Sequence, residues 1–557
     1  MKNYILIALL FIGLLTFTQC NEYFDKETND VLESKNYVGN VDELYAGFRG
    51  IASAVQDVAD QAVFLTELRG DLLEPTSNAP QDFWDVYNYS GKENSLTDPK
   101  GYYNVIVNAN DFISKAFEYR KENPTAIEDG IFNPLISGAI RYKVWAYMML
   151  AKIYGQAVYF DDPLVSYSDI SKYPLLQQTE VFQKCLTLMQ DGVNGVPGTV
   201  PLTLSTILSQ NVSTASDLTW DLICPNQDVL QMELNLWLGN YQKVVDLAVP
   251  FIYDNGTKRY KLSNEDWNAE WSNFFYHAVT TETKELITVV PYNYAFHQTN
   301  HIISYFSDVY PNLYYLRPTQ VAMDRFNAQI QYDGVSKTDK YRGDGYTFDQ
   351  INGNWVLRKF LKANETPQTV YKSDIAIVLY RAADVHMFLA EALNQLEMFP
   401  EALAILDDGL SNYLSLYASN LRAPFDNATY NAVLVQNLGI RRRVSLAPVL
   451  KFQTKNNANY YSPVAGDTMW LDKPEGAQRY KRLFDEALAE ESCMESAGEA
   501  KSFFTMERIA ERYNDASIIA DRVSAKYSND LNLKQKVYDK LMQGDWYVPF
   551  DLKNTNN

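Results

Sequence analysis

Cysteine and histidine are both scarce in this chain of 557 residues, with four of each. The cysteines stand at positions 20, 185, 224 and 493, and none belongs to the close C-x-x-C pair of a zinc ribbon. His297 and His301 are four residues apart, but the glutamate of a metalloprotease helix is missing between them. We therefore expect no metal site and no fold held together by a disulfide framework.

Basic residues are fewer than acidic ones: the chain has 49 Lys and Arg but 69 Asp and Glu, which gives a formal net charge of −20. Nucleic-acid binding needs clustered basic side chains, so the charge balance argues against nucleic acid as a partner. It also argues against electrostatic docking on anionic lipid. We interpret the surplus of acidic residues as a feature that keeps the protein soluble. We expect the one basic run, Arg441–Arg443, to hold a helix end together rather than to bind a ligand.

Long apolar runs are missing beyond Tyr4–Phe17, which follows Lys2 and is too short to cross a bilayer comfortably. This pattern is typical of a signal-peptide core. The run ends in T-F-T-Q-C, which puts Cys20 where a lipoprotein signal is cut and the thiol acylated, although Gln19 replaces the usual small residue. An ordinary secretory signal followed by a coincidental cysteine is the alternative.

The expected organisation has three parts. Residues 1–19 form a lipoprotein signal peptide, residues 20–38 form a lipidated cysteine with a polar, flexible tether, and residues 39–557 form a single domain. If Cys20 carries lipid, three cysteines remain and at most one disulfide can form. Whether Cys185, Cys224 and Cys493 are free is left open.

Helical periodicity is what the rest of the chain has in abundance. In VLYRAADVHMFLAEALNQLEMFPEALAIL, residues 378–406, small and aromatic residues recur at the spacing of a tetratricopeptide helix pair: Ala390, Leu393, Phe399, Ala402 and Leu406. Helix pairs of this kind are expected near residues 40–120, 132–160, 226–252 and 378–412. Asn40 and Glu43 give the first helix a start like a capping box, and Gly239 with Tyr241 marks the turn of the third pair.

Long stretches without helical periodicity separate these pairs. Residues 71–100 are rich in Pro, Ser, Asn and Asp and are predicted to be a long loop. Residues 282–347 mix β-branched and Tyr-rich runs such as LITVVPYNY and are predicted to be loops with short strands. The expected fold is therefore mainly all-α, with tetratricopeptide-like helix pairs as a scaffold and loop-rich, short-strand insertions that carry the ligand site.

Three motifs resemble one known family. They are R-x-x-D followed by A-E-A-L-N (Arg381 to Asn394), an acidic and aromatic run directly after Cys20, and W-Y-V-P-F at residues 546–550. Together they resemble the SusD/RagB family, the surface glycan-binding lipoproteins of Gram-negative polysaccharide-utilisation systems. The resemblance touches nearly the whole chain after the signal, and its most specific part is the A-E-A-L-N helix.

The resemblance implies a location, a partner and a ligand class. The protein is expected on the cell surface, lipid-anchored in the outer membrane through Cys20. It is expected to capture an oligosaccharide and deliver it to a TonB-dependent SusC-type transporter, on which it acts as a lid. A nutrient-uptake protein of this kind is not an enzyme and needs no cofactor.

A glycan is held by flat aromatic faces and by planar polar groups that satisfy its hydroxyls. The segment at residues 67–89, ELRGDLLEPTSNAPQDFWDVYNY, supplies both kinds of group. The candidates there are Arg69, Asp71, Trp84, Asn88 and Tyr89. In the family's type member an Arg, a Trp fifteen residues later and a nearby Asn contribute to the sugar site. The resemblance therefore implies this role for Arg69, Trp84 and Asn88, and Trp84→Ala is expected to cost the most affinity.

The central insertion adds aromatic candidates by position alone: Tyr292, Tyr294, Tyr314 and Tyr315. For all these residues a structural role is the alternative, with Trp84 as a loop anchor, Arg69 and Asp71 as capping or ion-paired groups, and the tyrosines in the core.

Other functions stay open at this point. The chain shows no nucleophile elbow and no phosphate-binding loop, and 69 carboxylates make Asp and Glu pairs inevitable, so that a glycosidase dyad cannot be recognised. The rivals are a peptide-binding lid of the RagB type, a secreted glycosidase or peptidase, and a structural lipoprotein that only stabilises the transporter. The identity of the glycan is also left open.

Overall fold

The structure is a computed structural model. It describes residues 38–164, 170, 172–202, 220–255, 257–264, 274–275, 285–298, 300–361, 374–409, 421–450, 452–455, 458–461, 469–471 and 473–550. The predicted signal peptide and most of the predicted tether, including Cys20, lie outside these residues.

Helices dominate the described chain, which confirms the prediction of a mainly all-α fold. The longer ones are α3 (Val41–Gln56), α4 (Ala59–Arg69), α6 (Lys100–Glu122), α7 (Asp129–Tyr154), α8 (Gln178–Asp191), α10 (Gln227–Trp237), α11 (Tyr241–Ile252), α15 (Ala382–Gln395), α19 (Pro474–Glu495), α20 (Ser502–Tyr513) and α22 (Leu531–Met542). The shorter ones are α5 (Gln81–Tyr87), α9 (Trp220–Ile223), α13 (Ile302–Phe306), α14 (Gln320–Ala328), α16 (Phe399–Leu403), α18 (Ala428–Val435) and α21 (Ser517–Ser524).

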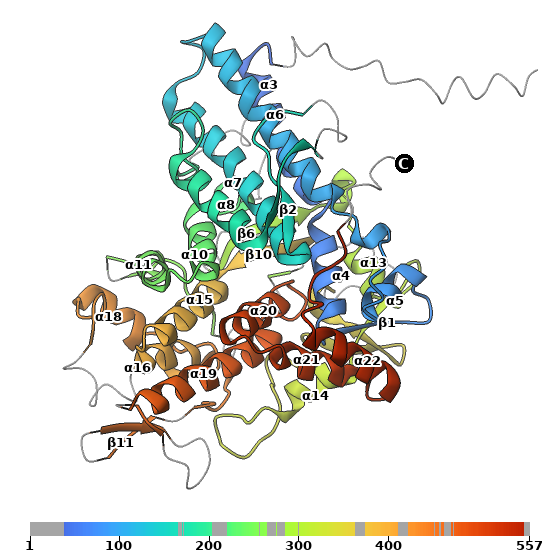
Figure 1. Cartoon of the computed structure of the whole chain (residues 1–557), viewed down its shortest axis with the longest axis vertical. Helices are drawn as coiled ribbons and strands as arrows, with labels where there is room; N and C mark the ends of the chain where they lie inside the picture. The colour runs from blue at the N-terminus through green and yellow to red at the C-terminus, as the bar shows by residue number, and fades with distance from the viewer. Residues whose placement is uncertain are drawn as a thin grey trace, which may run out of the picture.

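Successive helices form one continuous scaffold (Figure 1). Contacts run from α3 to α6, α7, α8, α10, α11 and α15, and then to α19 and α20. Each helix packs on the next, as in stacked tetratricopeptide pairs. The helices α4, α5 and α13 lie together at the other side of the molecule from α11 and α16 (Figure 1).

Local sequence explains the ends of several helices. The Asn40 side chain accepts a hydrogen bond from the Glu43 amide at 3.0 Å and donates one to the Glu43 carboxylate, which confirms the predicted start of α3. Gly239, with φ of +74°, makes the turn between α10 and α11. Phe399 packs on Tyr480 of α19, with ring centroids 4.7 Å apart.

Two predicted helix pairs differ from the observed elements. Residues 132–160 hold one long helix, α7, which packs against α6 and α8 instead of turning back on itself. In the last pair, residues 375–381 are a strand and α15 begins only at Ala382. Residues 375–381 are apolar and β-branched, and they pair with a second apolar strand at residues 286–292. Local periodicity alone therefore cannot distinguish this strand from a helix.

The strands form short antiparallel sheets. Their bounds are β1 (Leu73–Pro75), β2 (Gln156–Val158), β3 (Leu175–Gln177), β4 (Tyr253–Asp254), β5 (Thr257–Lys258), β6 (Leu286–Tyr292), β7 (Leu316–Pro318), β8 (Phe348–Ile351), β9 (Asn354–Leu357), β10 (Ile375–Arg381), β11 (Phe452–Lys455), β12 (Ala458–Tyr461) and β13 (Met469–Trp470). The longest pair is β6 with β10, in which Tyr292 lies opposite Ile375. The pair of β1 with β7 ties the segment after α4 to the central insertion.

The segment at residues 71–100 is not one long loop. It contains β1, the seven-residue helix α5 and a 3₁₀ helix at Ser95–Thr97. The helix α5 begins after Pro80 without a side-chain cap and is too short for a clear periodicity, which explains why a composition rich in turn residues concealed it.

A cluster of buried ion pairs lies where the end of α19 meets β6, β10 and the loops that carry Arg342 and Arg443. Arg381 pairs with Glu285, Glu495 and Glu499, and all four side chains are at most 1% exposed. Arg443 pairs with Glu285 and Glu495, and Arg342 pairs with Glu495 as well.

The basic run Arg441–Arg443 has the structural role that we predicted for it. Arg441 pairs with Glu491 and Arg443 pairs with Glu495, both near the C-terminal end of α19. Arg442 lies over the ring of Tyr332, 3.7 Å from its centroid.

Cys185, Cys224 and Cys493 are free thiols in the described chain, and all three are buried. Burial raises the pKa of Cys224 and of Cys493 to about 11, so neither is a reactive thiolate. None of the helices described here combines the length and the apolar character needed to cross a membrane.

Stability is expected to depend on pH through Glu507, a buried residue of α20 that accepts a hydrogen bond from Gln178 at 2.7 Å. Burial and the neighbouring Glu511 raise its pKa from 4.5 to about 8. A raised carboxyl pKa means that the folded protein holds the proton longer, so stability is lost as the pH rises from about 4.5 towards 8. The loss for this group is about 3 kcal/mol between about pH 5.5 and 8.

Glu507→Gln mimics the protonated form and should remove this part of the pH dependence. Urea unfolding of the wild type and the variant at both pH values measures it, with Glu122→Gln on the exposed end of α6 as the control. An equal fall in stability for the wild type and Glu507→Gln would contradict the assignment.

Candidate functional site

An open groove lies where the first turns of α4, α5 and α6 meet the segment around α13. Its volume is about 790 Å³, which is large enough for several sugar rings. Gly101 permits the close approach of α6 to α4, since a Cβ there would lie 2.6 Å from a methyl carbon of Val58. Side chains of the groove come from two separate stretches of the sequence: Asp60, Gln61, Asp82, Phe83, Asp98, Lys100 and Asn104 from one, and His301, Tyr305 and Tyr315 from the other.

Three aromatic rings form a strip along this wall. Tyr305 stacks on His301 with centroids 5.1 Å apart, and on Tyr315 with centroids 4.9 Å apart, at interplanar angles of 22° and 30°. Nearly parallel rings about 5 Å apart are stacked with an offset, so Tyr305 lies between His301 and Tyr315 and holds these two rings in place. Phe64 and Phe83 pack against Tyr305 from the protein side at 5.0 and 5.3 Å. The strip is therefore rigidly supported and faces the groove.

An ion pair fixes one end of the strip. Nδ1 of His301 lies 2.9 Å from the Asp60 carboxylate, which also accepts a hydrogen bond from the His301 backbone amide. The hydrogen bond with Asp60 raises the pKa of His301 above its usual value. Asp60 is buried, whereas the His301 side chain is 64% exposed, so the imidazole presents a free face to the groove.

Several polar groups in the same lining are hydrogen-bond acceptors. The Gln61 amide nitrogen donates to the carbonyl oxygens of Leu96 and Asp98, which fixes this side chain in the lining. The Asp82 carboxylate accepts the Ser95 hydroxyl hydrogen bond at 2.6 Å. This side of the groove can accept hydrogen bonds from ligand hydroxyl groups.

The combination of aromatic rings and hydrogen-bond acceptors can bind a ligand. An apolar aromatic strip facing hydrogen-bond acceptors matches a sugar ring, which has apolar C–H faces and a rim of hydroxyl groups. In the described parts of the chain, no group of three or more His, Cys, Asp and Glu side chains is arranged to hold a metal ion. His297 and His301 do not share a helix face, because α13 begins after His301.

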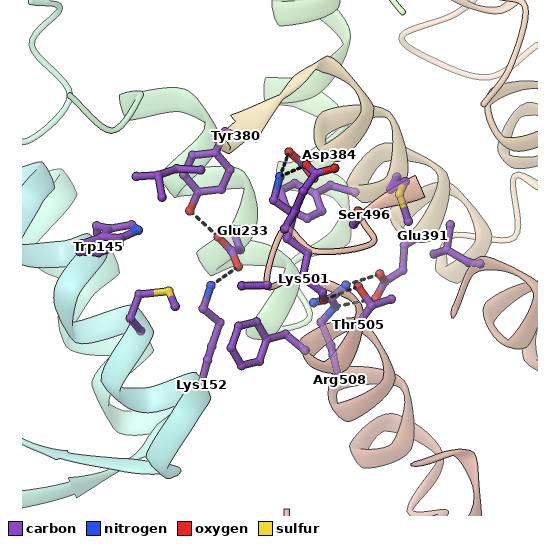
Figure 2. Close-up of a pocket in the computed structure, with 18 residues that line it drawn as sticks. Trp145, Lys152, Glu233, Tyr380, Asp384, Glu391, Ser496, Lys501, Thr505 and Arg508 are labelled. Atoms are coloured by element: carbon purple, nitrogen blue, oxygen red, sulfur yellow. Dashed lines mark hydrogen bonds and ion pairs between the residues drawn. The ribbon is translucent and has the colours of Figure 1, made fainter. Parts of the chain in front are cut away.

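A second cavity, of about 60 Å³, lies between α7, α10, α15 and α20 (Figure 2). Its charged side chains already pair with one another. Lys152 contacts Glu233 at 2.8 Å, and Figure 2 also shows the pairs Lys501 with Asp384 and Arg508 with Glu391. The Glu233 carboxylate also accepts a hydrogen bond from the Tyr380 hydroxyl. This interior therefore joins the helices, and the open groove is the better candidate for a ligand site.

Four of the predicted sugar-binding residues are buried and used inside the protein. Arg69 is 4% exposed and lies over the ring of Phe503, 4.7 Å from its centroid. The Tyr89 hydroxyl donates to the backbone carbonyl of Arg69, which anchors the end of α5. Asp71 is 3% exposed and pairs with Arg325. Burial opposes ionisation of Asp71, but Arg325 lowers its pKa below the usual value.

Tyr292 is the fourth of these residues. It is 3% exposed, and its hydroxyl donates to the backbone carbonyl of Gln56 at 2.6 Å. The prediction that Arg69, Asp71, Tyr89 and Tyr292 offer surface to a glycan is corrected by this burial, since none of them lines the groove.

The remaining candidates are more accessible, but only one lies in the groove. Tyr315 is part of the aromatic strip. Trp84 is half-buried on α5 and contacts Tyr87 edge-on at 6.0 Å, outside the groove lining. Asn88 caps the end of α5, and its side-chain oxygen has no partner in the described part of the chain. The Tyr314 hydroxyl donates to the Trp355 carbonyl, and Tyr294 is 44% exposed beside β6.

Sequence reasoning missed the centre of the strip. His301 and Tyr305 stand four residues apart, so one helical turn places both rings on one face. The Tyr305 amide donates to the His301 carbonyl at 2.9 Å, as this spacing requires. From the sequence alone we consider His301 only together with His297, as a metal-binding pattern, whereas the aromatic pair of His301 and Tyr305 at i and i+4 is the signal that could identify these residues.

Comparison with known proteins gives a consistent result. The family model described as SusD family matches residues 282–556. No protein with a curated description matches the chain. A solved SusD superfamily protein from Bacteroides vulgatus is similar at 15% identity and a TM-score of 0.61, and the match covers 92% of this chain and 97% of that one.

Two further structures are similar. A laminarin-binding SusD-like protein has 14% identity and a TM-score of 0.52, covering 87% of this chain and 94% of its own. A SusD-like carbohydrate-binding protein from Bacteroides vulgatus has 13% identity and a TM-score of 0.54, covering 84% of this chain and 83% of its own.

Proposed function

The chain belongs to the SusD family, and from that premise we propose that it is a cell-surface protein that binds an oligosaccharide for nutrient uptake. Similar folds occur in a laminarin-binding protein and in a carbohydrate-binding protein, which supports a glycan as the ligand class.

The observation that carries this proposal is the groove with its strip of His301, Tyr305 and Tyr315. The ring faces of His301 and Tyr315 that Tyr305 does not cover stack on the C–H faces of sugar units. Acceptors in the same lining, among them Asp82, receive hydrogen bonds from hydroxyl groups. Of the candidates chosen from the sequence, Tyr315 belongs to this site. Trp84, Asn88 and Tyr294 lie outside the groove lining, and we propose them as contacts for longer ligands that extend beyond it.

A binding screen with oligosaccharides and peptides tests the proposal. We expect binding to glycans, and we expect glycan polymers to keep their length after prolonged incubation with the protein. Shortened polymers would indicate a glycosidase. Binding to peptides alone would favour a peptide-binding lid of the RagB type.

The proposal places the protein on the outer membrane through a lipid at Cys20. The support is the sequence around that cysteine, which follows the apolar run Tyr4–Phe17 directly. Cys20→Ala should move the protein from the membrane fraction to the soluble fraction without unfolding it, because the described domain begins only at residue 38. Fractionation followed by immunoblotting measures this, and full retention in membranes without the transporter would contradict the anchor.

The proposed partner is a TonB-dependent transporter of the SusC type, with this protein as its lid. Family membership supports this role, because capture at the surface needs a route across the outer membrane. A lid that stays in place needs a broad interface, so a large β-barrel protein should co-purify even without glycan. Repeated isolation of the protein alone from native outer membranes in mild detergent would argue against the lid.

A further inference from the structure

We infer that the groove selects glycans whose units are uncharged or carry amino groups, and that it disfavours glycans rich in carboxylate or sulfate. This inference rests on the proposed function of the groove as a glycan site. It adds the chemical class of the ligand, which the family and the fold leave open.

The polar lining is dominated by groups that accept hydrogen bonds. Asp57 and Asp98 are exposed at the groove, and Asp82 is half-buried there. Asp82 uses its Oδ2 atom for Ser95, which leaves Oδ1 available. An acceptor of this kind is satisfied by a hydroxyl or an ammonium group, and is repelled by an anionic ligand.

Cationic side chains are few in this lining. Among the residues that line the groove, Lys100 and His301 are the ones able to carry a positive charge. His301 is matched by the Asp60 carboxylate at 2.9 Å, so a ligand anion competes with that carboxylate for it. The groove therefore lacks the paired Arg or Lys groups with which proteins usually hold carboxylates and sulfates.

Helix starts could in principle bind an anion here, because α5 and α6 both begin at the groove. The start of α5 has no side-chain cap, but at the start of α6 and in the neighbouring 3₁₀ helix at Ser95–Thr97 the protein's own side chains already occupy backbone amides. The Lys100 amide donates to Oδ1 of Asp98 at 2.9 Å, and the Ser95 amide donates to Asp82 at 3.3 Å. The amides of Leu96 and Thr97 donate to Asn94. An arriving carboxylate finds these donors in use and negative charge beside them.

The aromatic strip gives the same groove its general affinity for pyranose rings, whatever their charge. Charge selection therefore adds to the affinity from stacking. The carboxylates leave the affinity for neutral sugars unaffected, raise it for amino sugars by attraction, and lower it for acidic sugars by repulsion. The expected order of affinity is amino glycans at or above neutral glycans, with acidic glycans lowest.

The experiment is a titration of the full chain in detergent with tetramers of three charge classes. The neutral probes are the tetramers of glucose with α-1,4, β-1,4 and β-1,3 linkage. The amino probe is the glucosamine tetramer at about pH 6, where its amines are protonated. The acidic probes are tetramers of galacturonic and mannuronic acid. We expect acidic tetramers to bind at least about ten-fold more weakly than the best neutral or amino tetramer, and the difference to shrink with added salt.

A charge-neutralised variant links this order to the groove. Asp57→Asn combined with Asp98→Asn keeps the side-chain oxygen that caps α6 while removing two negative charges. It should weaken the amino tetramer and strengthen the acidic tetramers by about three- to five-fold each, while neutral tetramers change by less than either charged class, because Asn keeps one acceptor oxygen at each position. The matched control is Asp246→Asn on α11, an exposed carboxylate on the far side of the molecule (Figure 1).

The outcomes separate the two proposals. Acidic tetramers that bind as tightly as neutral ones would overturn the charge selection while leaving glycan binding intact. An unchanged order of affinity in the Asp57→Asn, Asp98→Asn variant would also overturn it. If no oligosaccharide binds the full chain, the proposed function itself fails.

Discussion

Replacing Arg381 by methionine is expected to lower the free energy of unfolding by about 3–5 kcal/mol. Arg381 is fully buried, and its guanidinium is hydrogen-bonded to Glu285, Glu495 and Glu499. It donates to their carboxylates, and to the backbone carbonyl of Glu495, over 2.6 to 3.0 Å. Burial disfavours its charge, but Glu499 and Glu495 hold the pKa of Arg381 above its usual value.

Methionine fills a similar volume without the charge, so the main effect is on the carboxylates left behind. They cannot reach water. Arg342 and Arg443 remain beside Glu285 and Glu495, and Lys359 and Lys501 remain beside Glu499. The measured loss of unfolding free energy reports the cost of leaving buried carboxylates unpaired. It does not report the net stabilisation by the ion pairs, which is smaller because the charges lose their hydration on burial.

Urea unfolding followed by circular dichroism measures the effect. Arg317→Met is the matched control, because Arg317 pairs with Glu74 at the surface with 51% of its side chain exposed, and should cost less than about 1 kcal/mol. If Arg381→Met yields too little folded protein, Glu495→Gln tests the same cluster with a smaller change in shape. Equal stability of both cluster variants and the wild type would contradict a structural role for the cluster.

The scaffold could be predicted from the sequence because its signals are local. Ala390 and Leu393 lie three residues apart and are both fully buried, as the tetratricopeptide spacing predicts. Asn40 caps α3 through a residue only three positions away. Such contacts depend on helical geometry alone, and a single sequence contains that information.

The site was harder to predict because its contacts are distant in the sequence. Asp60 and His301 meet although 241 residues separate them, and Asp71 is covered by Arg325, 254 residues further along. A polar residue in a segment rich in turn residues is expected at the surface. Arg69 and Asp71 are instead buried, because cation–π contacts and ion pairs from remote segments satisfy them. The family resemblance points to α5 and the central insertion, both of which contribute residues to the groove, but not to most of the residues that line it.

Tyr305→Ala is expected to weaken glycan binding by about ten- to one-hundred-fold, the second large effect. The variant removes the central ring of the strip and leaves His301 and Tyr315 without their common neighbour. The loss of one buried aromatic contact is about 1.5–3 kcal/mol. Tyr305→Phe should keep most of the affinity, because the stacking surface remains and only the hydroxyl is lost.

Trp84→Ala is the decisive comparison, since the sequence alone favours Trp84 as the main platform and the structure places it outside the groove lining. Calorimetric titration of both alanine variants with the best glycan ligand separates the two sites, provided that thermal unfolding shows both variants to be folded. A groove-centred site requires a large loss for Tyr305→Ala and a loss below about three-fold for Trp84→Ala, because an edge-on contact with Tyr87 supports the loop rather than the ligand. The reverse order would place the sugar at α5, and the groove would then be a neighbouring surface without the main role in binding.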